Sequence, residues 1–513
     1  MFFAMFRKDL SMRMKKYLLQ LLCLSLLLSQ VGCTKTTEET KAVDTQTTQD
    51  TNAIEETVDF ENMSLTERMQ YSRSGISDGL PERNYDGYTF RVQDIYNKRI
   101  LRSLDDTGEA VDSAMYNRQL AIEDRFNIQI EPAGIVDTST NVGFDQTYQL
   151  ISNYLMAQED SLDLLQLWNT MSASLVTQGY FLDLSTIDAL DFSKPWFYQD
   201  AIHSLSYKNH VFLSVDMSIP FFSELQAVFY NKGLATDHGI EGLYDTVRNG
   251  EWTLDKFKEL SQDLWVDTNG NGIVDADKDS FGAAFATAEF GYIGIPVFGV
   301  TLIGKDENDV PQLNVSANME RFDTVFTTMR DLIVESDSVC YTDWEITPFM
   351  EDRALFAVKS LGLLTSLRDT EFDYGVLPLF KWDENQANYS SAYLPYPNAI
   401  PGTVQDPERS AIVLSALAST GYKDVYPVYY DNALKSKLVR DEDSAEMIDV
   451  IVSNVIVDGS LMYADAGTGI YFFHFYMTSG KEFASYYASQ SSAMQAMVEE
   501  QSKLLDKVIE RNS

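Results

Sequence analysis

The placement of the cysteines constrains the fold of this chain more than any other feature. Three cysteines occur in 513 residues: Cys23 and Cys33 lie close to the N-terminus, and only Cys340 follows. If both early cysteines act outside the body of the protein, no internal disulfide can form there. Such a body must be held together by a large apolar core. Cys340 is then expected to be a small buried hydrophobe.

The first 32 residues have the order of an export signal. Five basic residues precede an apolar run from Tyr17 to Leu28, and the small-residue sequence Ser-Gln-Val-Gly-Cys follows. The run is only about 12 residues long, whereas a membrane-spanning helix needs roughly 20. Residues 1–32 are therefore predicted to be a signal peptide, and no later segment is long and apolar enough to span a membrane.

Val31-Gly32-Cys33 resembles the lipobox of bacterial lipoproteins, although Gln30 stands where that family usually has leucine. The resemblance implies that a lipid is attached to Cys33 and that palmitate is one of its acyl chains. Residues 33–80 are polar and acidic with few aromatics, which predicts a flexible, lipid-anchored spacer. The expected location is the outer face of the cytoplasmic membrane, at the cell surface, and a periplasmic location stays open.

Roughly 430 residues remain after the spacer, too many for one ordinary core and enough for two lobes. Alternation at residues 88–92, helical spacing at residues 111–126 and alternation at residues 128–130 predict strand, helix and strand. This is the repeating unit of a parallel sheet, so an α/β fold is expected. The net charge of −38 makes nucleic acid and anionic lipid poor partners.

No pattern of catalytic residues stands out. The chain has four histidines and 77 acidic residues, so a pair of carboxylates suitable for glycoside hydrolysis would be found by chance. It shows no His-x-x-x-His pair, no Gly-x-Ser-x-Gly elbow and no phosphate-binding loop. We therefore expect a protein that is not an enzyme.

Several short motifs occur along this chain in the same order as in one known protein family. They are Tyr230-Asn231-Lys232, Trp252-Thr253 with Phe257, Asp373-Tyr374-Gly375-Val376-Leu377-Pro378 and Ala399-Ile400-Pro401-Gly402-Thr403. Together they resemble the extracellular solute-binding proteins of ABC importers, family 1-like and of the carbohydrate type, over roughly residues 85–510. The resemblance implies a type II periplasmic-binding-protein fold, in which each lobe is a mixed sheet flanked by helices and is discontinuous in the chain. Residues 85–218 with 354–404 are the expected first lobe, and residues 219–353 with 405–510 the expected second.

The same resemblance implies that the protein is a monomer whose lobes close on a small solute. It also implies that membrane permease subunits bind the closed form. Aromatic faces mixed with polar groups favour a sugar or oligosaccharide. A cell-surface glycan-processing enzyme, or an adhesive or sensory binding protein of the same fold, remain alternatives. Trp168 either stacks on the solute or packs beneath its loop, and each other candidate has a similar packing alternative. The candidate ligand-binding residues are Trp168, Asn169, Glu224, Phe290, Tyr292, Arg368, Tyr393 and Tyr396.

A loop rich in oxygen ligands follows the Trp252 motif. Its side chains alternate with other residues, and Gly272 holds the sixth place, as in a calcium-binding loop. The twelfth place is Lys278 instead of glutamate, so either Asp277 or Asp279 would have to substitute. A structural calcium ion and a metal-free turn both fit this pattern. The candidate metal ligands are Asp267, Asn269, Asn271, Ile273, Asp275, Asp277 and Asp279.

Overall fold

The computed structural model describes the chain from residue 65 onward, with short gaps. The described residues are 65–95, 101, 103, 106–137, 142–216, 219–286, 289–291, 294–342, 346–431, 438–460 and 471–512. The predicted signal peptide, Cys33 and residues 34–64 of the predicted spacer lie outside these ranges.

The first lobe is built on a four-stranded sheet with the order β12-β3-β1-β2. β1 (Tyr88–Gln93) pairs in parallel with β2 (Ile128–Pro132) and β3 (Leu164–Gln166), and β12 (Asn398–Ala399) joins β3 antiparallel. α3 (Ala110–Phe126) connects β1 to β2 and buries Met115 and Ile122. This confirms the strand, helix and strand that the sequence predicted. α4 (Phe144–Ala157) leads into β3.

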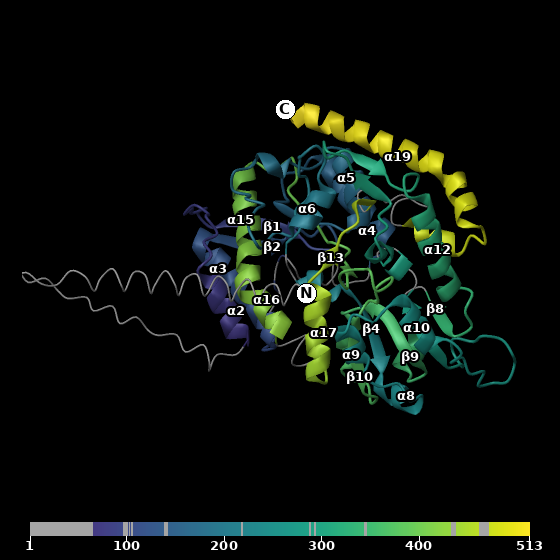
Figure 1. Ribbon diagram of the computed structural model, residues 1–513. Coiled ribbons are helices and arrows are strands. Elements are labelled where there is room, and N and C mark those ends of the chain that lie inside the picture. The colour runs from purple at the N-terminus through teal and green to yellow at the C-terminus, as the bar shows by residue number, and fades with distance from the viewer. Residues whose placement is uncertain are drawn as a thin grey trace, which may run out of the picture. The chain divides into compact units, whose positions relative to one another are not determined.

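The second lobe is built on a five-stranded mixed sheet with the order β10-β4-β9-β5-β8. In two of these five strands, β4 (Gln226–Asn231) and β5 (Phe281–Ala286), every residue is buried, as expected for a sheet covered on both faces. Figure 1 shows α8, α9 and α10 beside this sheet. The other strands are β8 (Val339–Thr342), β9 (Ala354–Ser360) and β10 (Tyr374–Pro378), and the helices are α8 (Lys232–Asp237), α9 (Leu243–Arg248), α10 (Leu254–Ser261), α12 (Met319–Ile333), α13 (Thr347–Met350) and α14 (Leu363–Leu367). Cys340 is buried in β8, as predicted.

Local sequence signals set the ends of the helices that flank this second sheet. The Asn231 side chain accepts a hydrogen bond from the Leu234 amide and caps α8, and the Thr253 hydroxyl accepts one from the Lys256 amide and caps α10. α10 also lies very close to β5. A Cβ atom added to Gly282 would stand 1.7 Å from the Ser261 carbonyl oxygen, so only glycine permits this contact.

The predicted division between the lobes is wrong in two places. Residues 354–378 were assigned to the first lobe, but β9 and β10 both pair with β4 in the second sheet. Residues 405–420 were assigned to the second lobe, but α15 (Pro407–Thr420) packs its Ala411 and Ile412 into the core around Phe90 of β1. The chain returns to the first lobe only after β10, because the strand pairing, and not the order of motifs, decides lobe membership.

The predicted spacer is wrong for residues 65–80. α2 (Leu65–Ser74) packs on η4 (Gly421–Val425) and α16 (Tyr426–Val428). The Arg73 guanidinium lies 4.1 Å and 4.0 Å from the ring centres of Tyr422 and Tyr426. Leu80 packs against the core of the first lobe. The segment is too polar to fold alone, and it becomes ordered because the body offers aromatic partners.

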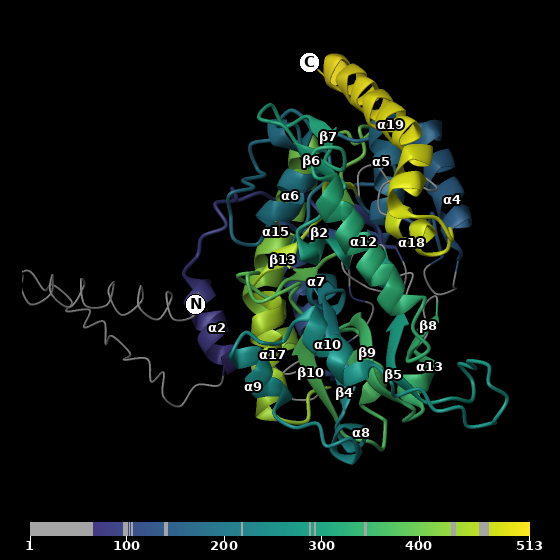
Figure 2. The ribbon, with the colours of Figure 1, turned by 45° about the vertical axis from the view of Figure 1, so that its right-hand side comes forward.

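The remaining elements connect or cover the lobes. α19 packs against both α5 and α12, and so contacts both lobes (Figures 1 and 2). Among the described helices, none is both long and apolar enough to cross a membrane. The elements not yet given are α5 (Asn169–Thr177), η2 (Leu184–Thr186), α6 (Gln199–Leu205), α7 (Ile219–Ser223), η3 (Ile295–Phe298), β6 (Ile303–Lys305), β7 (Pro311–Leu313), β11 (Ser391–Ala392), α17 (Glu442–Val452), β13 (Val455–Ile456), α18 (Tyr471–Met477) and α19 (Phe483–Asn512).

Candidate binding site

The carboxyl ends of the parallel strands define one edge on each sheet. In the first sheet this edge holds the ends of β1, β2 and β3 and the start of β12. In the second it holds the ends of β5, β8 and β9 and the start of β4. A short segment containing α7 joins the two edges, and the return segment after β10 joins them again. Ligands of open α/β sheets bind at such edges, which makes them the place to look for a site.

An aromatic pair lies at the edge of the first sheet. Trp168 follows β3 and is only 8% exposed, because the Phe144 ring stacks on it at 5.2 Å between ring centres with 17° between the planes. Phe144 is itself 40% exposed. Phe144 was not among the predicted ligand contacts, since a single aromatic at the start of a helix forms no sequence pattern. Of the two rings, Phe144 offers the larger accessible surface to a ligand.

A second aromatic reaches the same edge from the C-terminal part of the chain. Tyr471 opens α18, and its hydroxyl is hydrogen-bonded to the side chain of Thr170, two residues after Trp168. Burial raises the pKa of Tyr471, and the bond to Thr170 partly offsets this. The tyrosine is thus a neutral hydrogen-bonding group at neutral pH. Sequence reasoning had no signal for it, because the contact joins residues about 300 positions apart.

A fixed carboxylate lies at the edge of the second sheet. Glu289 accepts hydrogen bonds from the Gln226 amide at 2.6 Å, the Ser360 backbone amide at 2.8 Å and the Lys359 ammonium at 3.1 Å. Lys359 and Glu289 form an ion pair that is mostly shielded from solvent. These bonds hold the acidic group in one orientation and neutralise its charge. Glu289 directly precedes Phe290, which the sequence had favoured as the ligand contact at this edge.

The crossing segments bring three of the predicted residues together. Tyr393 is buried against Phe221, with 5.1 Å between ring centres, and its hydroxyl is hydrogen-bonded to the backbone of Tyr396. Burial raises the pKa of Tyr393 well above its usual value, and the negative charges of Asp216 and Glu224 raise it further. Glu224 and Tyr396 are half-buried. Tyr393 is therefore a packing residue of the crossing, and the other two retain some accessible surface.

Two other predictions of ligand contact are not supported by the packing, and the prediction for Tyr292 stays a prediction. Phe290 is fully buried, with its ring edge-on to Phe285 at 5.3 Å, so it belongs to the core of the second lobe. Asn169 is buried as the first residue of α5. Tyr292 lies outside the described residues.

Arg368 lies at the wrong end of the second lobe. β10 starts opposite Asn231, which is the last residue of β4, so the segment before β10 is at the amino edge of the sheet. Arg368 is in that segment, with a side chain 63% exposed and paired with the exposed Asp369. The prediction followed the motif order, and it failed because α14 carries the chain from the carboxyl edge to the amino edge before Arg368 is reached.

The calcium-like loop is closed by its own hydrogen bonds. The Asp267 carboxylate accepts from the amides of Gly270 and Gly272, both at 2.6 Å. The buried Asp279 carboxylate accepts from the Trp265 indole at 3.0 Å and the Thr268 amide at 3.1 Å. In this arrangement the donors are amide and indole groups of the loop itself.

Burial would raise the pKa of Asp279, but these hydrogen bonds outweigh it and lower that pKa. Within the described ranges, no three carboxylate, histidine or cysteine side chains converge as a metal site. A calcium ion at this loop stays a prediction.

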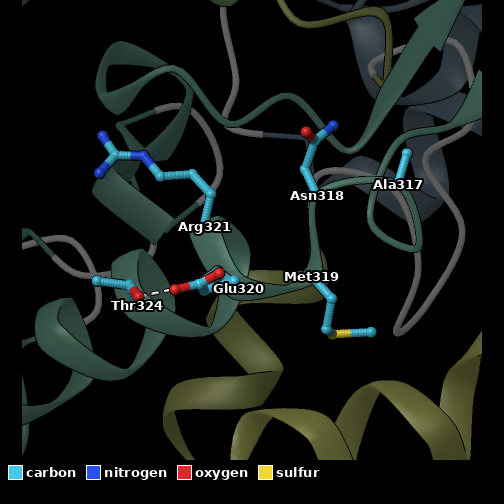
Figure 3. A pocket seen from close by; sticks show the side chains of 6 residues that line it. All are labelled: Ala317, Asn318, Met319, Glu320, Arg321 and Thr324. Atoms are coloured by element: carbon cyan, nitrogen blue, oxygen red, sulfur yellow. Dashed lines mark hydrogen bonds between the residues drawn. The ribbon is translucent and has the colours of Figure 1, made fainter.

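A separate cavity of about 410 Å³ lies at the amino end of α12 (Figure 3). None of the predicted ligand residues lines it. Arg321, on its wall, donates to the Phe298 carbonyl oxygen at 2.8 Å and lies 4.5 Å from the ring centre of Trp382. Its cation is therefore engaged by the protein. The lining residues are Ala317, Asn318, Met319, Glu320, Arg321 and Thr324.

No family model and no curated protein matches the sequence of this chain. Solved structures do match its fold. The chain resembles the GacH receptor of Streptomyces glaucescens, solved unliganded and with acarbose and an acarbose homologue, at 14% identity and a TM-score of 0.52, covering 80% of this chain and 99% of that one. It resembles UgpB from Mycobacterium tuberculosis in complex with glycerophosphocholine at 13% identity and a TM-score of 0.52, covering 81% and 99%.

A third similar structure is an ABC substrate-binding protein from Listeria monocytogenes in complex with cycloalternan. It shares 11% identity with this chain at a TM-score of 0.50, and the match covers 82% of this chain and 98% of the other. At such low identity the likeness shows the fold. The predicted α/β architecture is thus confirmed, and the chain has the two-lobed fold of these three proteins.

Proposed function

We propose that this protein captures a small solute, a sugar or oligosaccharide, between its lobes outside the cell and delivers it to an ABC importer by closing around it. The fold supports the capture step. The observation that carries the proposal is the pair of unlike groups at the two sheet edges. One lobe offers the exposed ring of Phe144 stacked on Trp168, and the other offers the fixed carboxylate of Glu289.

These groups suit a polyhydroxylated ring. A flat aromatic face fits the C–H face of a pyranose through dispersion, and a carboxylate held by its neighbours accepts hydrogen bonds from ligand hydroxyls without having to reorganise. The Tyr471 hydroxyl adds a neutral polar partner. The ligands named for the similar structures include sugars such as acarbose and cycloalternan, and also glycerophosphocholine. A sugar is therefore a proposal argued from the site chemistry as well as from the fold.

Isothermal titration against a panel of oligosaccharides tests the ligand class, with amino acids and peptides as controls. We expect saturable one-to-one binding to at least one oligosaccharide. Binding only to the control ligands would overturn the sugar assignment. Small-angle scattering with and without the ligand would then test closure, for which a smaller radius of gyration is expected.

We further propose that no reaction occurs at this site. Glu289 is engaged by three donors, an arrangement that holds a carboxylate in place as an acceptor. Incubation with polysaccharides and with the bound oligosaccharide should release no reducing sugar. Release that disappears in a Glu289→Gln variant would instead identify a glycan-processing enzyme.

The remaining parts of the proposal concern the cell. The protein is a monomer, held to the membrane by a lipid on Cys33, and its partners are permease subunits. A deletion strain should lose uptake of the identified solute. Unchanged uptake would favour an adhesive or sensory binding protein.

A further inference from the structure

Three polar side chains lie in a row where the crossing segments meet the first sheet. Asn398 stands directly opposite Gln166 of β3 in an antiparallel pair, and it also forms an antiparallel bridge with Ser214. Directly opposed residues in such pairs project to the same face of a sheet with Cβ atoms about 5 Å apart. The three side chains are therefore neighbours on one face. Each is at most 1% exposed.

The side chains leave four polar atoms without a hydrogen-bond partner among the described residues. These are Oε1 of Gln166, Nδ2 and Oδ1 of Asn398, and Oγ of Ser214. The backbone does not satisfy them, because the amide and carbonyl groups of Ser214 and Asn398 already bond to each other at 2.9 Å and 2.8 Å. Leaving four buried polar atoms unpaired would cost a large part of the net stability of a folded protein. A partner of the right chemistry is therefore needed at this place.

We infer that this row, which we name the crossing triad (Ser214, Asn398 and Gln166), is a binding site for internal water. The atoms to be satisfied include an amide donor, two carbonyl acceptors and a hydroxyl that can do either. A bare cation would leave the Asn398 donor unpaired, and a simple anion would leave both carbonyl groups unpaired. A solute that enters and leaves during transport would need an opening, whereas the triad is enclosed. Water both donates and accepts, and it is small enough for such a site.

The position of the crossing triad gives this water a structural task. Ser214 belongs to the segment that leaves the first lobe, Asn398 to the segment that returns, and Gln166 is the last residue of β3, two positions before Trp168. Water bonded to all three would join both crossing segments to the edge of the first sheet through side chains that do not bond to one another. This inference does not depend on which solute the protein binds.

Crystallography of the protein, at a resolution that shows ordered water, is the direct test. We expect solvent density within hydrogen-bonding distance of all three side chains. If the amide groups of Gln166 and Asn398 instead turn and bond directly to each other and to Ser214, the inference is overturned. Density with the coordination of a metal ion would overturn it as well.

A double-mutant cycle gives an independent measurement in solution. Ser214→Ala and Asn398→Leu should each lower the unfolding temperature, and the double variant should lose less than the two losses combined, because the shared water leaves with the first substitution. Asn231 is equally buried but bonds directly to Asp352 and to the Leu234 amide, so Ser214→Ala with Asn231→Leu should be additive. Additive losses in the crossing triad would contradict the inference.

Discussion

At the scale of the residue, exposure separates groups that sequence alone treats as equal. Trp168 and Phe290 both follow strands and are both aromatic, so the sequence predicts a ligand contact for each. The structure covers Trp168 with Phe144 and buries Phe290 against Phe285. Glu289, one position before Phe290, holds the polar role at that edge. Packing therefore leaves an accessible aromatic ring, that of Phe144, near the end of β3, and a carboxylate, that of Glu289, where the sequence predicted an aromatic contact after β5.

Phe144 is expected to contribute to solute binding. Phe144→Ala should weaken binding of the identified sugar about tenfold by removing one stacking face, with little change in unfolding temperature because the ring is partly exposed. Met156→Ala, at an exposed position on the same helix, is the matched control and should bind normally. Titration calorimetry measures both. Equal affinities for the two variants would remove Phe144 from the site.

Asp458 is expected to make stability depend on pH. Burial raises the pKa of this carboxyl to about 6, against hydrogen bonds from Ser460 and Leu302 that lower it. The folded state therefore holds the proton more tightly than the unfolded state, for which the pKa is about 4. The stability from this proton is fully present below about pH 4 and is lost as the pH rises through about 6, at a cost of about 3 kcal/mol.

Asp458→Asn removes this titration and keeps an oxygen acceptor for the Ser460 amide, which lies 2.8 Å from the carboxylate. The variant should be more stable than the unsubstituted protein above pH 6, and the two should converge towards pH 4. Urea unfolding across this pH range measures the difference. Curves that stay parallel over the whole range would show that Asp458 does not titrate in this way.

At the scale of the element, strong periodic patterns predicted structure and weak ones did not. β1, α3 and β2 follow from alternating and helical spacing. α2 has no such apolar pattern, and its Arg73 instead lies over two tyrosines about 350 positions away, with a hydrogen bond to the Tyr422 carbonyl oxygen at 2.7 Å. The order of α2 therefore depends on contacts with distant residues, which the local sequence pattern does not contain.

Removing the Arg73 contact should release α2. Arg73→Ala is expected to lower stability by about 1–2 kcal/mol, since it deletes a cation–π contact with two rings and a hydrogen bond. Hydrogen exchange should then speed up across α2 and remain unchanged in α3. Arg83→Ala, which removes an exposed pair with Glu408, is the control and should change neither quantity much. Unchanged exchange in the Arg73 variant would show that α2 is held by other contacts.

The calcium prediction belongs to the loop after α10. If calcium binds there, a chelator should lower the unfolding temperature and added calcium should restore it. Asp277 is exposed, so Asp277→Asn should leave the unfolding temperature in chelator unchanged, and it should abolish the calcium response if Asp277, and not Asp279, replaces the missing glutamate. Differential scanning calorimetry distinguishes a calcium-binding loop from a metal-free turn. A protein that ignores both chelator and calcium has a loop held by its Asx hydrogen bonds alone.

At the scale of the whole molecule, the order of segments along the chain does not show which lobe each segment belongs to. Two separate stretches of chain build the sheet of the first lobe, and β12 reaches it only after five strands have completed the second sheet. α19 then contacts both lobes. The sequence motifs identified the fold class correctly but misplaced the return crossing, because a motif marks a local segment and not the strand that it pairs with.

Membrane attachment is a prediction about the entire protein. Cys33→Ala should move it from the membrane fraction to the soluble fraction or the medium, because no lipid can then be attached. Folding and sugar affinity should be unaffected, since Cys33 precedes every described element. Fractionation with immunoblotting tests this, and continued retention of the variant would contradict lipid anchoring.

Taken by itself, the sequence determined the α/β class, the strand, helix and strand that open the first lobe, and the burial of Cys340. These depend on periodicity and on the apolar character of near neighbours in the chain. Tertiary structure alone decided the docking of α2, the meeting of Phe144 with Trp168 and the crossing triad. Each of these joins residues that are distant in the chain, and the free energy of such contacts depends on packing that no local pattern contains.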